Sequence, residues 1–417
     1  MVDNAYSPVS EMSLWWLGQT APKLIGQLVL AENNRKVGLA YADEWLQNGF
    51  ALSDDLPLSN DLYLPKELDA AAGAVNDARP DRWGERVIRH IFKPARLSLL
   101  EYLYFAGHDR FGALGVSLHE TRYDAVAATA IATFENLPQM QLAIQRVLAG
   151  ENLNEAHTRL LRPGPSFGGA HPKSLIEMDG QQWVVKFAET AEWDMPLIEH
   201  ASMTLAAKAG IDVALTRALG LPQGHAVAVA RFDRQATSRL HVLSAHTVLR
   251  AAGEPMGYPE LSQLLRRYAQ PNLIKSQQAQ LFKRMVFNIL MDNTDDHEKN
   301  HTLLVPKPFE NGHLKLAPAY DLLPTNSGQG FQEFGCGVHG KDSTLVNAMS
   351  EFEAFGLSIA EAEGEVLRVV KVVDTWQQHF AQVGVSEEDM ESLALRIDGA
   401  GLWGKRRGWF AGVRPIQ

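Results

Sequence analysis

The sequence predicts an α+β fold with two lobes, and three observations lead to this prediction. Apolar and polar residues alternate in residues 24–30 and 36–42, which is typical of half-buried strands. A stretch dense in Gly and Pro, residues 162–174, is followed by two more short alternating segments. From about residue 244 onward, apolar residues recur at a helical spacing instead. We therefore expect a β-rich N-terminal subdomain, a mixed α/β lobe and a mostly helical C-terminal lobe.

The chain length agrees with more than one folded domain. Its 417 residues correspond to two or three domains at a usual size of about 150 residues. The changes in periodicity and composition along the chain indicate where these domains meet. We expect domains at residues 1–118, 119–240 and 241–417.

The first subdomain combines strands with helices. Alternation predicts its strands over residues 24–30, 36–42 and 49–53. Apolar residues spaced near 3.6 positions predict helices over 79–92 and 98–107, and residues 109–118 return toward a strand. A further helical segment is expected over residues 121–156.

Two strands around a turn should open the mixed lobe. Residues 174–178 and 183–189 flank the turn sequence DGQQ. Because side chains alternate along a strand, Lys186 shares a face with Val184 and projects from the strand. A lysine on a strand is therefore available to this lobe.

A helix, a strand and a second helix follow. Residues 197–210 have helical apolar spacing, and Gly210 stands where a helix C-cap is expected. Residues 225–234 are predicted as a strand, and residues 279–291 as an apolar helix.

Charge and composition exclude several classes of protein. The net charge is -10, so the chain has no overall basic field to attract nucleic acid. The single cysteine, Cys336, excludes an intramolecular disulfide and a multi-cysteine metal site. The N-terminus lacks the pattern of a signal peptide, and no stretch has the roughly 20 apolar residues of a membrane span. We expect a cytoplasmic protein without a membrane contact.

An unusual cluster of polar residues, NTDDHEKNH at residues 293–301, follows the apolar helix. Asp295 and Asn300 are five positions apart, which is the spacing of the catalytic aspartate and the metal-binding asparagine in protein-kinase loops. Asp321, in the stretch LAPAYDLLP, comes after a strand-like segment, as the second metal-binding aspartate of a kinase does. The pattern favours phosphoryl transfer.

Transfer of a phosphoryl group from ATP needs further groups, and the chain offers them upstream. A glycine-rich backbone can approach the phosphates without Cβ atoms in the way, and GPSFGGAHPKS at residues 164–174 is such a segment. Lys186 can neutralise phosphate oxygens, and Glu199, at the start of a predicted helix, can hold that lysine in place.

The ordered set GPSFGGAHPKS, WVVKF, ARFDR, NILMDNTDDHEKNH and LAPAYDLLP resembles the HipA family of bacterial serine/threonine kinases, the toxins of type II toxin–antitoxin modules. KVGLAYADEWL, RPDRWGERVI and FGALGVSL are similar to the N-terminal subdomain of that family, so the resemblance covers nearly the whole chain. It implies a two-lobed, protein-kinase-like fold that uses ATP and Mg²⁺. It also implies a helix-turn-helix antitoxin of the HipB type as the partner that binds DNA, and an aminoacyl-tRNA synthetase, such as the glutamyl enzyme, as the substrate whose phosphorylation inhibits translation.

The resemblance also implies the roles of individual residues. Asp295 would be the catalytic base, acting with Lys186, Asn300 and Asp321, and Mg²⁺ would bind to Asn300 and Asp321. Ser166 matches a loop serine whose autophosphorylation silences some members. The implied ATP-binding residues are Gly168, Gly169, Ala170, His171, Pro172, Lys173, Lys186, Glu199, Ala230, Arg231, Phe232, His297, Glu298, Lys299, Asn300, Tyr320 and Asp321.

Other interpretations of the same residues stay open. His297 and His301 are four apart, so with Asp295 and Asp296 they could bind a transition metal from one helix face. A strand lysine commonly faces solvent, and Glu199 could lie on a helix surface. For the whole chain, the alternatives are a HipA-like kinase with a different substrate and a catalytically silent partner of a DNA-binding repressor.

Overall fold

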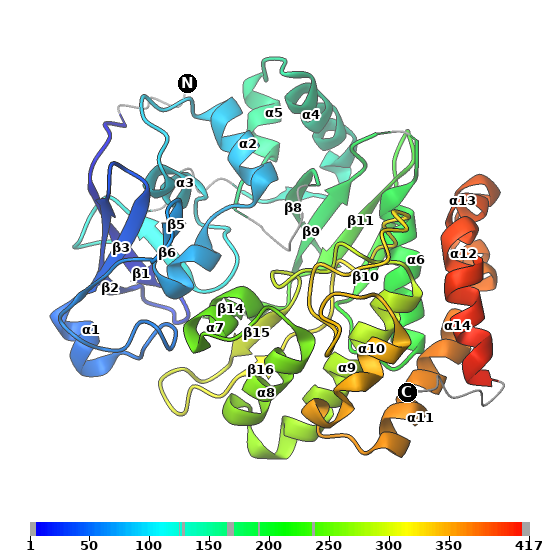
Figure 1. The fold of residues 1–417 in the computed structure, drawn as a ribbon. Coiled ribbons are helices and arrows are strands. Elements are labelled where there is room, and N and C mark those ends of the chain that lie inside the picture. The colour runs from blue at the N-terminus through cyan, green and yellow to red at the C-terminus, as the bar shows by residue number, and fades with distance from the viewer. Residues whose placement is uncertain are drawn as a thin grey trace. The chain divides into compact units, whose positions relative to one another are not determined.

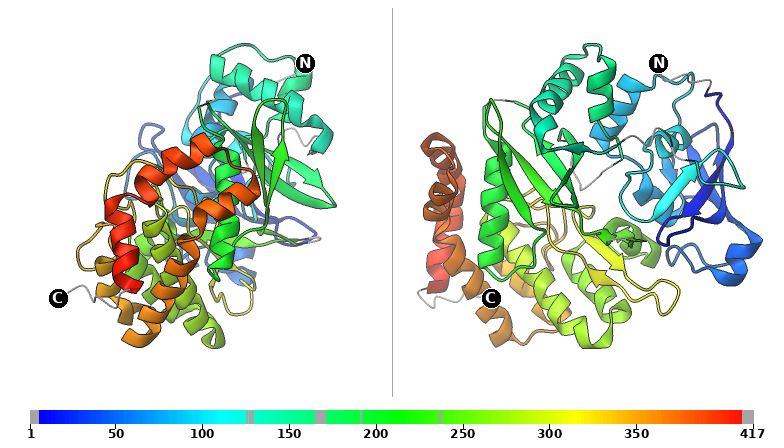
Figure 2. Two further views of the ribbon diagram at one scale, coloured as in Figure 1. Left: turned by 90° about the vertical axis from the view of Figure 1, so that its right-hand side faces the viewer. Right: turned by 180° about the vertical axis from the view of Figure 1, so that it is seen from behind.

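The computed structural model describes residues 6–124, 126, 130–164, 171–190, 192–235 and 238–410. The chain forms two compact units, each assembled from three stretches of sequence (Figures 1 and 2). The first unit comprises Met1–Glu189, Ala230–Leu243 and Leu304–Gly312, and the second comprises Thr190–Val229, Ser244–Leu303 and His313–Gln417. The N-terminal region is rich in strands and the C-terminal region is helical, so the predicted α+β class is confirmed. The predicted domain boundaries stay a prediction.

An N-terminal sheet organises the first unit. Its strand order is β4-β3-β2-β1-β6, and β5 pairs with β3 in parallel. The strands are β1 (Glu11–Trp16), β2 (Lys23–Ala31), β3 (Lys36–Tyr41), β4 (Leu62–Tyr63), β5 (Ala70–Ala71) and β6 (Leu114–Ser117). The strands predicted within 24–30, 36–42 and 109–118 are confirmed. Sequence alternation does not reveal β1, because all its residues after Glu11 are buried.

The predicted strand over residues 49–53 is wrong. Helix α1 (Asp43–Asn48) precedes this segment, and the Gly49 amide donates to the Trp45 carbonyl oxygen at 2.7 Å to close the helix. The Trp45 indole donates to the carbonyl oxygen of Phe50, and the Leu52 amide donates to Tyr41 Oη. Side-chain bonds thus take the backbone groups that a strand would have used.

The helices of the first unit begin at recognisable caps. Asp81 accepts a hydrogen bond from the Gly84 amide at the start of α2, and Ser98 forms a capping box at the start of α3. The helices are α1, α2 (Arg82–Ile91), α3 (Leu99–Phe105), α4 (Leu137–Ala149) and α5 (Glu155–Leu160), with short 3₁₀ helices at Gly73–Ala78 and Phe134–Asn136. The predicted helices within 79–92 and 98–107 are confirmed.

The predicted helical segment 121–156 is only partly correct. Helix α4 begins at Leu137 with a proline in its first turn, and Gly150 ends it with a left-handed φ of 73°. Residues Ala132–Thr133 instead form strand β7, which pairs in parallel with β8. The proline therefore marks the start of the helix rather than its interior.

Two strands of the first unit carry predicted site residues. Strand β8 (Lys173–Met178) is antiparallel to β9 (Gln181–Phe187), and Lys173 lies opposite Lys186 in this pairing. The two strands confirm the predicted pair around DGQQ. Further along the chain, β12 (Arg234–Gln235) pairs with β13 (Ser238–Arg239), and β14 covers His241–Ser244.

A cluster of aromatic rings joins the three stretches of the first unit. Phe50 lies within 5.1 Å of Trp16, 5.3 Å of Trp45 and 4.9 Å of Phe309, measured between ring centroids. The His241 ring is 5.6 Å from Phe50, and its Nε2 atom is 2.8 Å from the Leu52 carbonyl oxygen. This aromatic cluster contains residues from all three stretches, so the unit needs each of them.

The second unit is mostly helical. Its strands are β10 (Thr216–Gly220), β11 (His225–Ala230) and β16 (Lys315–Leu316), and β15 covers Thr302–Val305. Its helices are α6 (Met195–Lys208), α7 (Ala245–Ala252), α8 (Tyr258–Tyr268), α9 (Ile274–Leu290), α10 (Leu345–Ser350), α11 (Ile359–Val373), α12 (Trp376–Val383), α13 (Glu387–Ile397) and α14 (Ala400–Phe410), with 3₁₀ helices at Pro271–Leu273 and Phe352–Phe355. The predicted helix over 197–210 is confirmed as α6, and Gly210 follows it with a φ of 77°.

Helix α9 is the centre of this unit. It packs against α8, α10 and α11, and every residue from Leu281 to Leu290 is buried. The buried faces include the polar Lys283, Arg284 and Asn288, whose side chains donate to backbone carbonyl oxygens or to Tyr258. Since α9 leads directly into residues 292–301, this rigid helix positions the start of the acidic loop.

Candidate active site

Two segments of the second unit carry most of the predicted site, and Asn293 links them. The Asn293 amide nitrogen donates to Asn288 Oδ1 on α9 at 3.0 Å and reaches the Asp321 carbonyl oxygen at 3.5 Å. The backbone of Asp321 is thereby tied to the loop that contains Asp295. The structure brings these two predicted segments together within one unit.

A second set of bonds supports the same contact. The Thr325 amide and its hydroxyl both donate to the Asp292 carbonyl oxygen, at 3.0 and 2.8 Å. The hydroxyl of Thr294 lies 2.7 Å from that of Thr325 and 2.8 Å from that of Ser327. Hydrogen bonds therefore join residues 292–294 to residues 325–327.

Asp295 and Asn300 differ in their surroundings. Asp295 is exposed, whereas Asn300 is 4% exposed and its amide donates to the Asp295 carbonyl oxygen at 3.5 Å. The Asn300 backbone amide donates to the His297 carbonyl oxygen at 2.9 Å, which closes the turn between them. The exposed carboxylate can meet a substrate, while the asparagine faces inward.

The residues present fit a divalent cation. The Oδ1 atom of Asn300 is buried and has no hydrogen-bond partner among the described residues. Buried carbonyl oxygens normally have partners, so an unsatisfied one is suited to a ligand. Asp321 is half-buried and has a left-handed φ of 59°, an unusual conformation that is common at functional sites. Amide and carboxylate oxygens are the ligand types that Mg²⁺ accepts.

Asp296, to which the sequence assigns no role, is the buried anchor of the loop. It is 1% exposed and accepts hydrogen bonds from Tyr258 Oη and from His301 Nε2, the latter at 2.9 Å. Asn288 on α9 donates to the same tyrosine oxygen at 3.0 Å. Nearby Asp296 raises the pKa of Tyr258, although burial contributes most to that rise. We call Asp296, Tyr258, His301 and Asn288 the anchor network.

The transition-metal interpretation finds no support in this geometry. His297 and His301 lie in a turn rather than on one helix face, and His301 points to Asp296. The His297 ring nitrogen Nδ1 accepts from the Lys299 amide at 3.2 Å. In the described part of the chain, no three His, Cys, Asp or Glu residues converge as metal ligands.

Glu298 and Tyr320 hold the remaining part of the loop. His246 on α7 lies 3.2 Å from Glu298 and, through this hydrogen bond, lowers the pKa of the glutamate to about 2. The Tyr320 hydroxyl donates to the Lys299 carbonyl oxygen at 2.8 Å and lies 2.7 Å from the Thr302 hydroxyl. These contacts fix the backbone between Glu298 and Thr302.

The two lysines of the first unit that belong to the predicted site, Lys173 and Lys186, are both buried. Lys186 is 3% exposed, so it does not face solvent as a strand lysine commonly does. Lys173, 1% exposed, forms an ion pair with Asp81 at 2.5 Å, and its carbonyl oxygen accepts from the Trp83 indole at 2.8 Å. Glu199 is also buried, on α6 of the second unit, and neither it nor Lys186 lacks an interaction partner. Their mutual pairing stays a prediction.

The segment after β11 is held by an arginine. Arg231 forms a two-point ion pair with Asp233, at 2.9 and 2.7 Å, and its backbone amide donates to the Gln182 carbonyl oxygen at 3.0 Å. The Phe232 ring lies 5.6 Å from that of Phe111. The side chain of Arg231 is thus held within this segment by Asp233. The predicted contact of residues 230–232 with the adenine ring of ATP would therefore be made by the backbone.

Four predicted residues, Ser166, Gly168, Gly169 and Ala170, lie outside the described residues. Of the same loop, Pro172 is described, and its carbonyl oxygen accepts from the Phe187 amide at 2.9 Å. In the described residues, no helix is both long and apolar enough to cross a bilayer.

Sequence reasoning missed the anchor network and the role of Asp233. Tyr258 and Asp296 are 38 positions apart, and nothing local marks the tyrosine as their link. For Asp233, the alternation of charges in RFDR offered a signal, since a buried carboxylate between two arginines is a pattern of ion pairing.

Two protein-family models match this chain. Residues 165–382 match the family model of the HipA-like C-terminal domain, and residues 18–117 match that of the HipA N-terminal domain. Two proteins of Sinorhizobium fredii described as putative kinases are similar to the chain. Y4dM is 30% identical over 73% of this chain and 74% of its own length, and Y4mE is 25% identical over 94% and 96%.

A solved structure has the same fold. It is the complex of Shewanella oneidensis HipA with HipB and operator DNA. The match has a TM-score of 0.66 at 18% identity and covers 97% of this chain and all of that one.

Proposed function

The chain belongs to the HipA family, and on that premise we propose that it is a serine/threonine protein kinase that uses ATP and Mg²⁺. Two relatives that bear kinase descriptions support the reaction class. The observation that carries the proposal is the link from Asn293 to Asp321, which joins the DxxxxN loop to the second aspartate. This link ties the backbone of Asp321 to the loop that carries the exposed Asp295 and the buried Asn300.

Asp295 has the exposure that a catalytic base requires. Its carboxylate would accept a hydrogen bond from a serine or threonine hydroxyl and orient the hydroxyl toward the γ-phosphorus of ATP. The anchor network holds the backbone beside it through Asp296. Phosphoryl transfer depends mainly on positioning, so a rigid loop is a direct contribution to rate.

Asn300 and Asp321 would hold Mg²⁺, which neutralises negative charge on the phosphates of the nucleotide. The unsatisfied Oδ1 atom of Asn300 is the chain's own evidence for this role. Lys186 would offset the charge of other phosphate oxygens, with Glu199 as its predicted partner. Autophosphorylation of Ser166 remains part of the proposal as a means of self-inactivation.

A protein substrate and a repressor partner complete the proposal. The solved HipA complex contains HipB and operator DNA, and this supports a HipB-like helix-turn-helix antitoxin as partner. A chain with a net charge of -10 would then approach DNA only through that partner. An aminoacyl-tRNA synthetase, such as the glutamyl enzyme, is the proposed substrate, and its phosphorylation would inhibit translation.

The test compares the purified chain with Asp295→Gln. We expect both proteins to bind ATP in the presence of Mg²⁺, and only the unaltered chain to transfer the γ-phosphate. The matched control is Asp54→Asn, which alters an exposed aspartate far from the loop in sequence and should retain activity. Undiminished transfer by Asp295→Gln would refute the assignment of the base.

The same experiment separates the alternatives. A chain that shows no Mg²⁺-dependent affinity for ATP would instead be a silent partner of a repressor. A chain that transfers phosphate, but not to the glutamyl-tRNA synthetase, would be a HipA-like kinase with another substrate. Comparing phosphorylated proteins in cells that express the chain or Asp295→Gln would then identify that substrate.

A further inference from the structure

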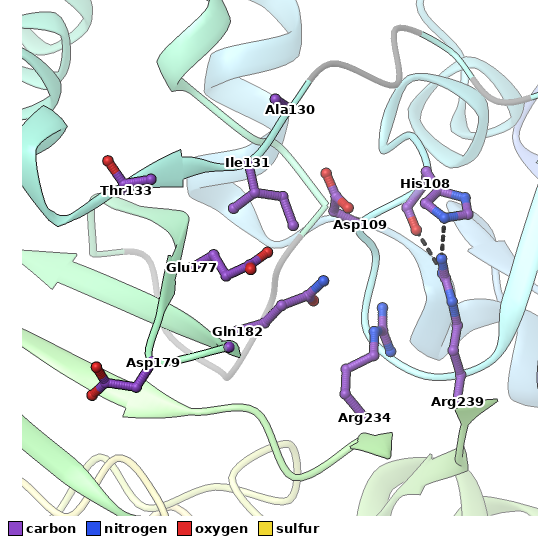
Figure 3. Close-up of a pocket in the computed structure, with 11 residues that line it drawn as sticks. His108, Asp109, Ala130, Ile131, Thr133, Glu177, Asp179, Gln182, Arg234 and Arg239 are labelled. Carbon is purple, nitrogen blue, oxygen red and sulfur yellow. Dashed lines mark hydrogen bonds between the residues drawn. The ribbon is translucent and has the colours of Figure 1, made fainter. Parts of the chain in front are cut away.

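A cavity of about 590 Å³ lies in the first unit, apart from the residues proposed for phosphoryl transfer. It lies beside β7, β8, β9 and the β12–β13 hairpin (Figure 3). Its volume falls in the usual range for sites of small ligands. None of its lining residues belongs to the predicted ATP site, so a function for this cavity would be a separate one.

One wall of the cavity is cationic. Arg239 donates to the carbonyl oxygen of His108 at 2.6 Å and to the ring nitrogen Nε2 of the same residue. Burial, and then the charge of Arg239, lower the pKa of His108 to about 4, so the ring is neutral near pH 7. Neither partner neutralises the guanidinium. Arg234 lines the same wall.

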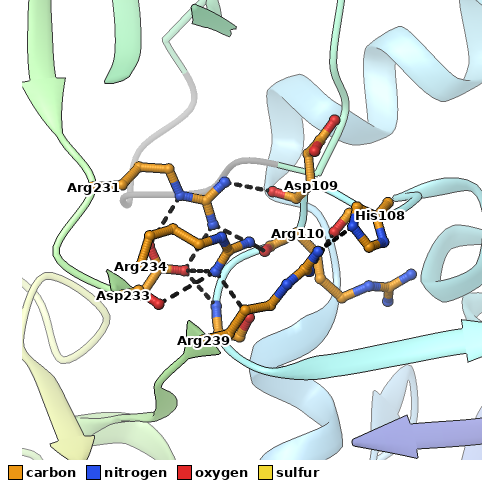
Figure 4. A network of polar contacts seen from close by, with 8 residues as sticks. His108, Asp109, Arg110, Arg231, Asp233, Arg234 and Arg239 are labelled. Carbon is orange, nitrogen blue, oxygen red and sulfur yellow. Dashed lines mark hydrogen bonds and ion pairs between the residues drawn. The ribbon is translucent and has the colours of Figure 1, made fainter. Parts of the chain in front are cut away.

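The layer behind this wall holds four arginines and two carboxylates, so positive charge is in excess; they are Arg110, Arg231, Arg234 and Arg239 with Asp109 and Asp233 (Figure 4). Burial opposes the ionisation of Asp233, but ion pairs with Arg231 and Arg234 lower its pKa to about 2. This one carboxylate therefore serves two arginines. Arg239 and the fully buried Arg110 pair with no carboxylate among the described residues.

An uncompensated charge that is partly removed from water is unfavourable. The cluster of arginines would be stabilised by an anion in the cavity. Arginine presents a planar set of N–H donors that matches a carboxylate or a phosphate. Two of the five N–H groups of Arg239 are used in the bonds to His108, so donors remain for a ligand.

The opposite wall carries acceptors. Glu177 on β8 and Gln182 on β9 extend into the cavity (Figure 3). The Oε1 atom of Gln182 is buried without a hydrogen-bond partner among the described residues. Glu177 forms no ion pair with any described residue. A ligand that meets this wall must bring hydrogen-bond donors.

We propose that the cavity binds a small zwitterion, whose anionic group contacts Arg239 and Arg234 and whose protonated amine contacts Glu177 and Gln182 Oε1. A simple anion would leave the buried Oε1 atom of Gln182 without a partner, whereas the amine of a zwitterion can reach both this atom and the exposed Glu177 carboxylate. A carboxylate and a phosphate share the chemistry of the anionic end. The site is independent of the proposed kinase reaction.

Calorimetric titration of the full chain tests this. The probes are phosphoethanolamine and β-alanine, which are zwitterions with a phosphate and a carboxylate respectively, together with inorganic phosphate and ethanolamine, which carry charge of only one sign and serve as the single-charge probes. We expect at least one zwitterion to bind about tenfold more tightly than either single-charge probe, since each wall contributes a charge-assisted bond. The zwitterion that binds more tightly shows whether the cavity prefers a phosphate or a carboxylate as the anionic group.

Two variants identify the walls. Glu177→Gln changes an exposed side chain, so the fold should be kept. The zwitterion should then bind no better to this variant than inorganic phosphate does. Arg239→Lys keeps the positive charge but removes the planar set of N–H donors. It should weaken the binding of the zwitterion and of inorganic phosphate alike. Asp295→Gln should leave binding unchanged. The proposal is overturned if no zwitterion binds, if inorganic phosphate binds equally well, or if Glu177→Gln has no effect.

Discussion

The Nε2 atom of His301 lies 2.9 Å from the Oδ2 atom of Asp296, and both side chains are at most 3% exposed. Asp295, the next residue along the chain, is exposed. Adjacent carboxylates in one loop thus have opposite environments. The buried one ties the loop to α8 and α9 through Tyr258 and Asn288, and the exposed one is the proposed catalytic base.

Asp296→Asn should slow phosphoryl transfer and destabilise the second unit. The change weakens two hydrogen bonds to a buried carboxylate, so we expect a loss of about 1–3 kcal/mol in the free energy of unfolding. The kcat should fall about tenfold, because a loop that shifts slightly loses alignment for transfer. Urea denaturation and a γ-phosphate transfer assay measure these effects. Tyr258→Phe, which removes one of the two bonds, should have a smaller effect, and an unchanged kcat in Asp296→Asn would contradict the positioning role.

Asn300→Ala should raise the Mg²⁺ concentration needed for activity. The variant loses the unsatisfied amide oxygen that we assign to the cation, and we expect about a tenfold rise in the half-maximal Mg²⁺ concentration, comparable to losing a supporting ligand interaction. Titrating Mg²⁺ in the transfer assay measures this. Asn300→Asp restores an oxygen at the same place and should recover most of the affinity for Mg²⁺. If Asn300→Ala has the Mg²⁺ dependence of the unaltered chain, the ligand assignment is wrong.

Lys173→Met should destabilise the first unit. Removal of the lysine leaves the Asp81 carboxylate without its ion pair, and the loss of one partner of a buried pair costs about 3 kcal/mol. Denaturation monitored by tryptophan fluorescence can follow this, because Trp83 contacts the Lys173 carbonyl oxygen. The double variant Lys173→Met with Asp81→Asn should cost less than the sum of the single changes. Additive effects would mean that the two residues do not interact.

Acidification should weaken the first unit between about pH 6.5 and pH 4. Burial lowers the pKa of His108 and of His241 to about 4, so below the usual histidine pKa of about 6.5 the unfolded chain binds protons that the folded chain does not. Stability from this source is constant above about pH 6.5 and falls as the pH drops toward 4. Urea denaturation at a series of pH values should show this slope, and His241→Gln should reduce it. His119→Gln, at an exposed position, is the control and should leave the slope unchanged.

The helices and strands that could be predicted from sequence are those in which the spacing of apolar residues is regular along the whole element. Strands β2, β3, β8 and β9 and helices α6 and α9 have apolar residues at one clear spacing. The prediction failed at residues 49–53 because side-chain bonds from Trp45 and Tyr41 outweighed the local alternation. The prediction also failed for the residues before Leu137, where composition suggests a helix. Helix α4 begins only at Leu137, with a proline in its first turn.

The candidate site was accessible to sequence reasoning only in part. The spacing of Asp295 and Asn300 is local and can be recognised, and Asp321 follows in a predictable order. Contacts such as Asn293 to the Asp321 carbonyl oxygen depend on the folding of α9 and the following loop, which no short motif encodes. The cationic cavity combines residues from four separate segments, so it could be found only in three dimensions.

The division of the first unit among three stretches of chain affects how the protein is made. Residues 304–312 supply Phe309 to the aromatic cluster, so the ribosome must synthesise the chain past this point before the cluster can close. Domains that are continuous in sequence can fold in turn as they emerge during translation. Here the growing polypeptide must keep Trp16, Trp45 and Phe50 without their last partner through the synthesis of more than 250 further residues, about half a minute at 5–20 residues per second. We expect these apolar rings to stay partly exposed during that interval, and such exposure favours aggregation.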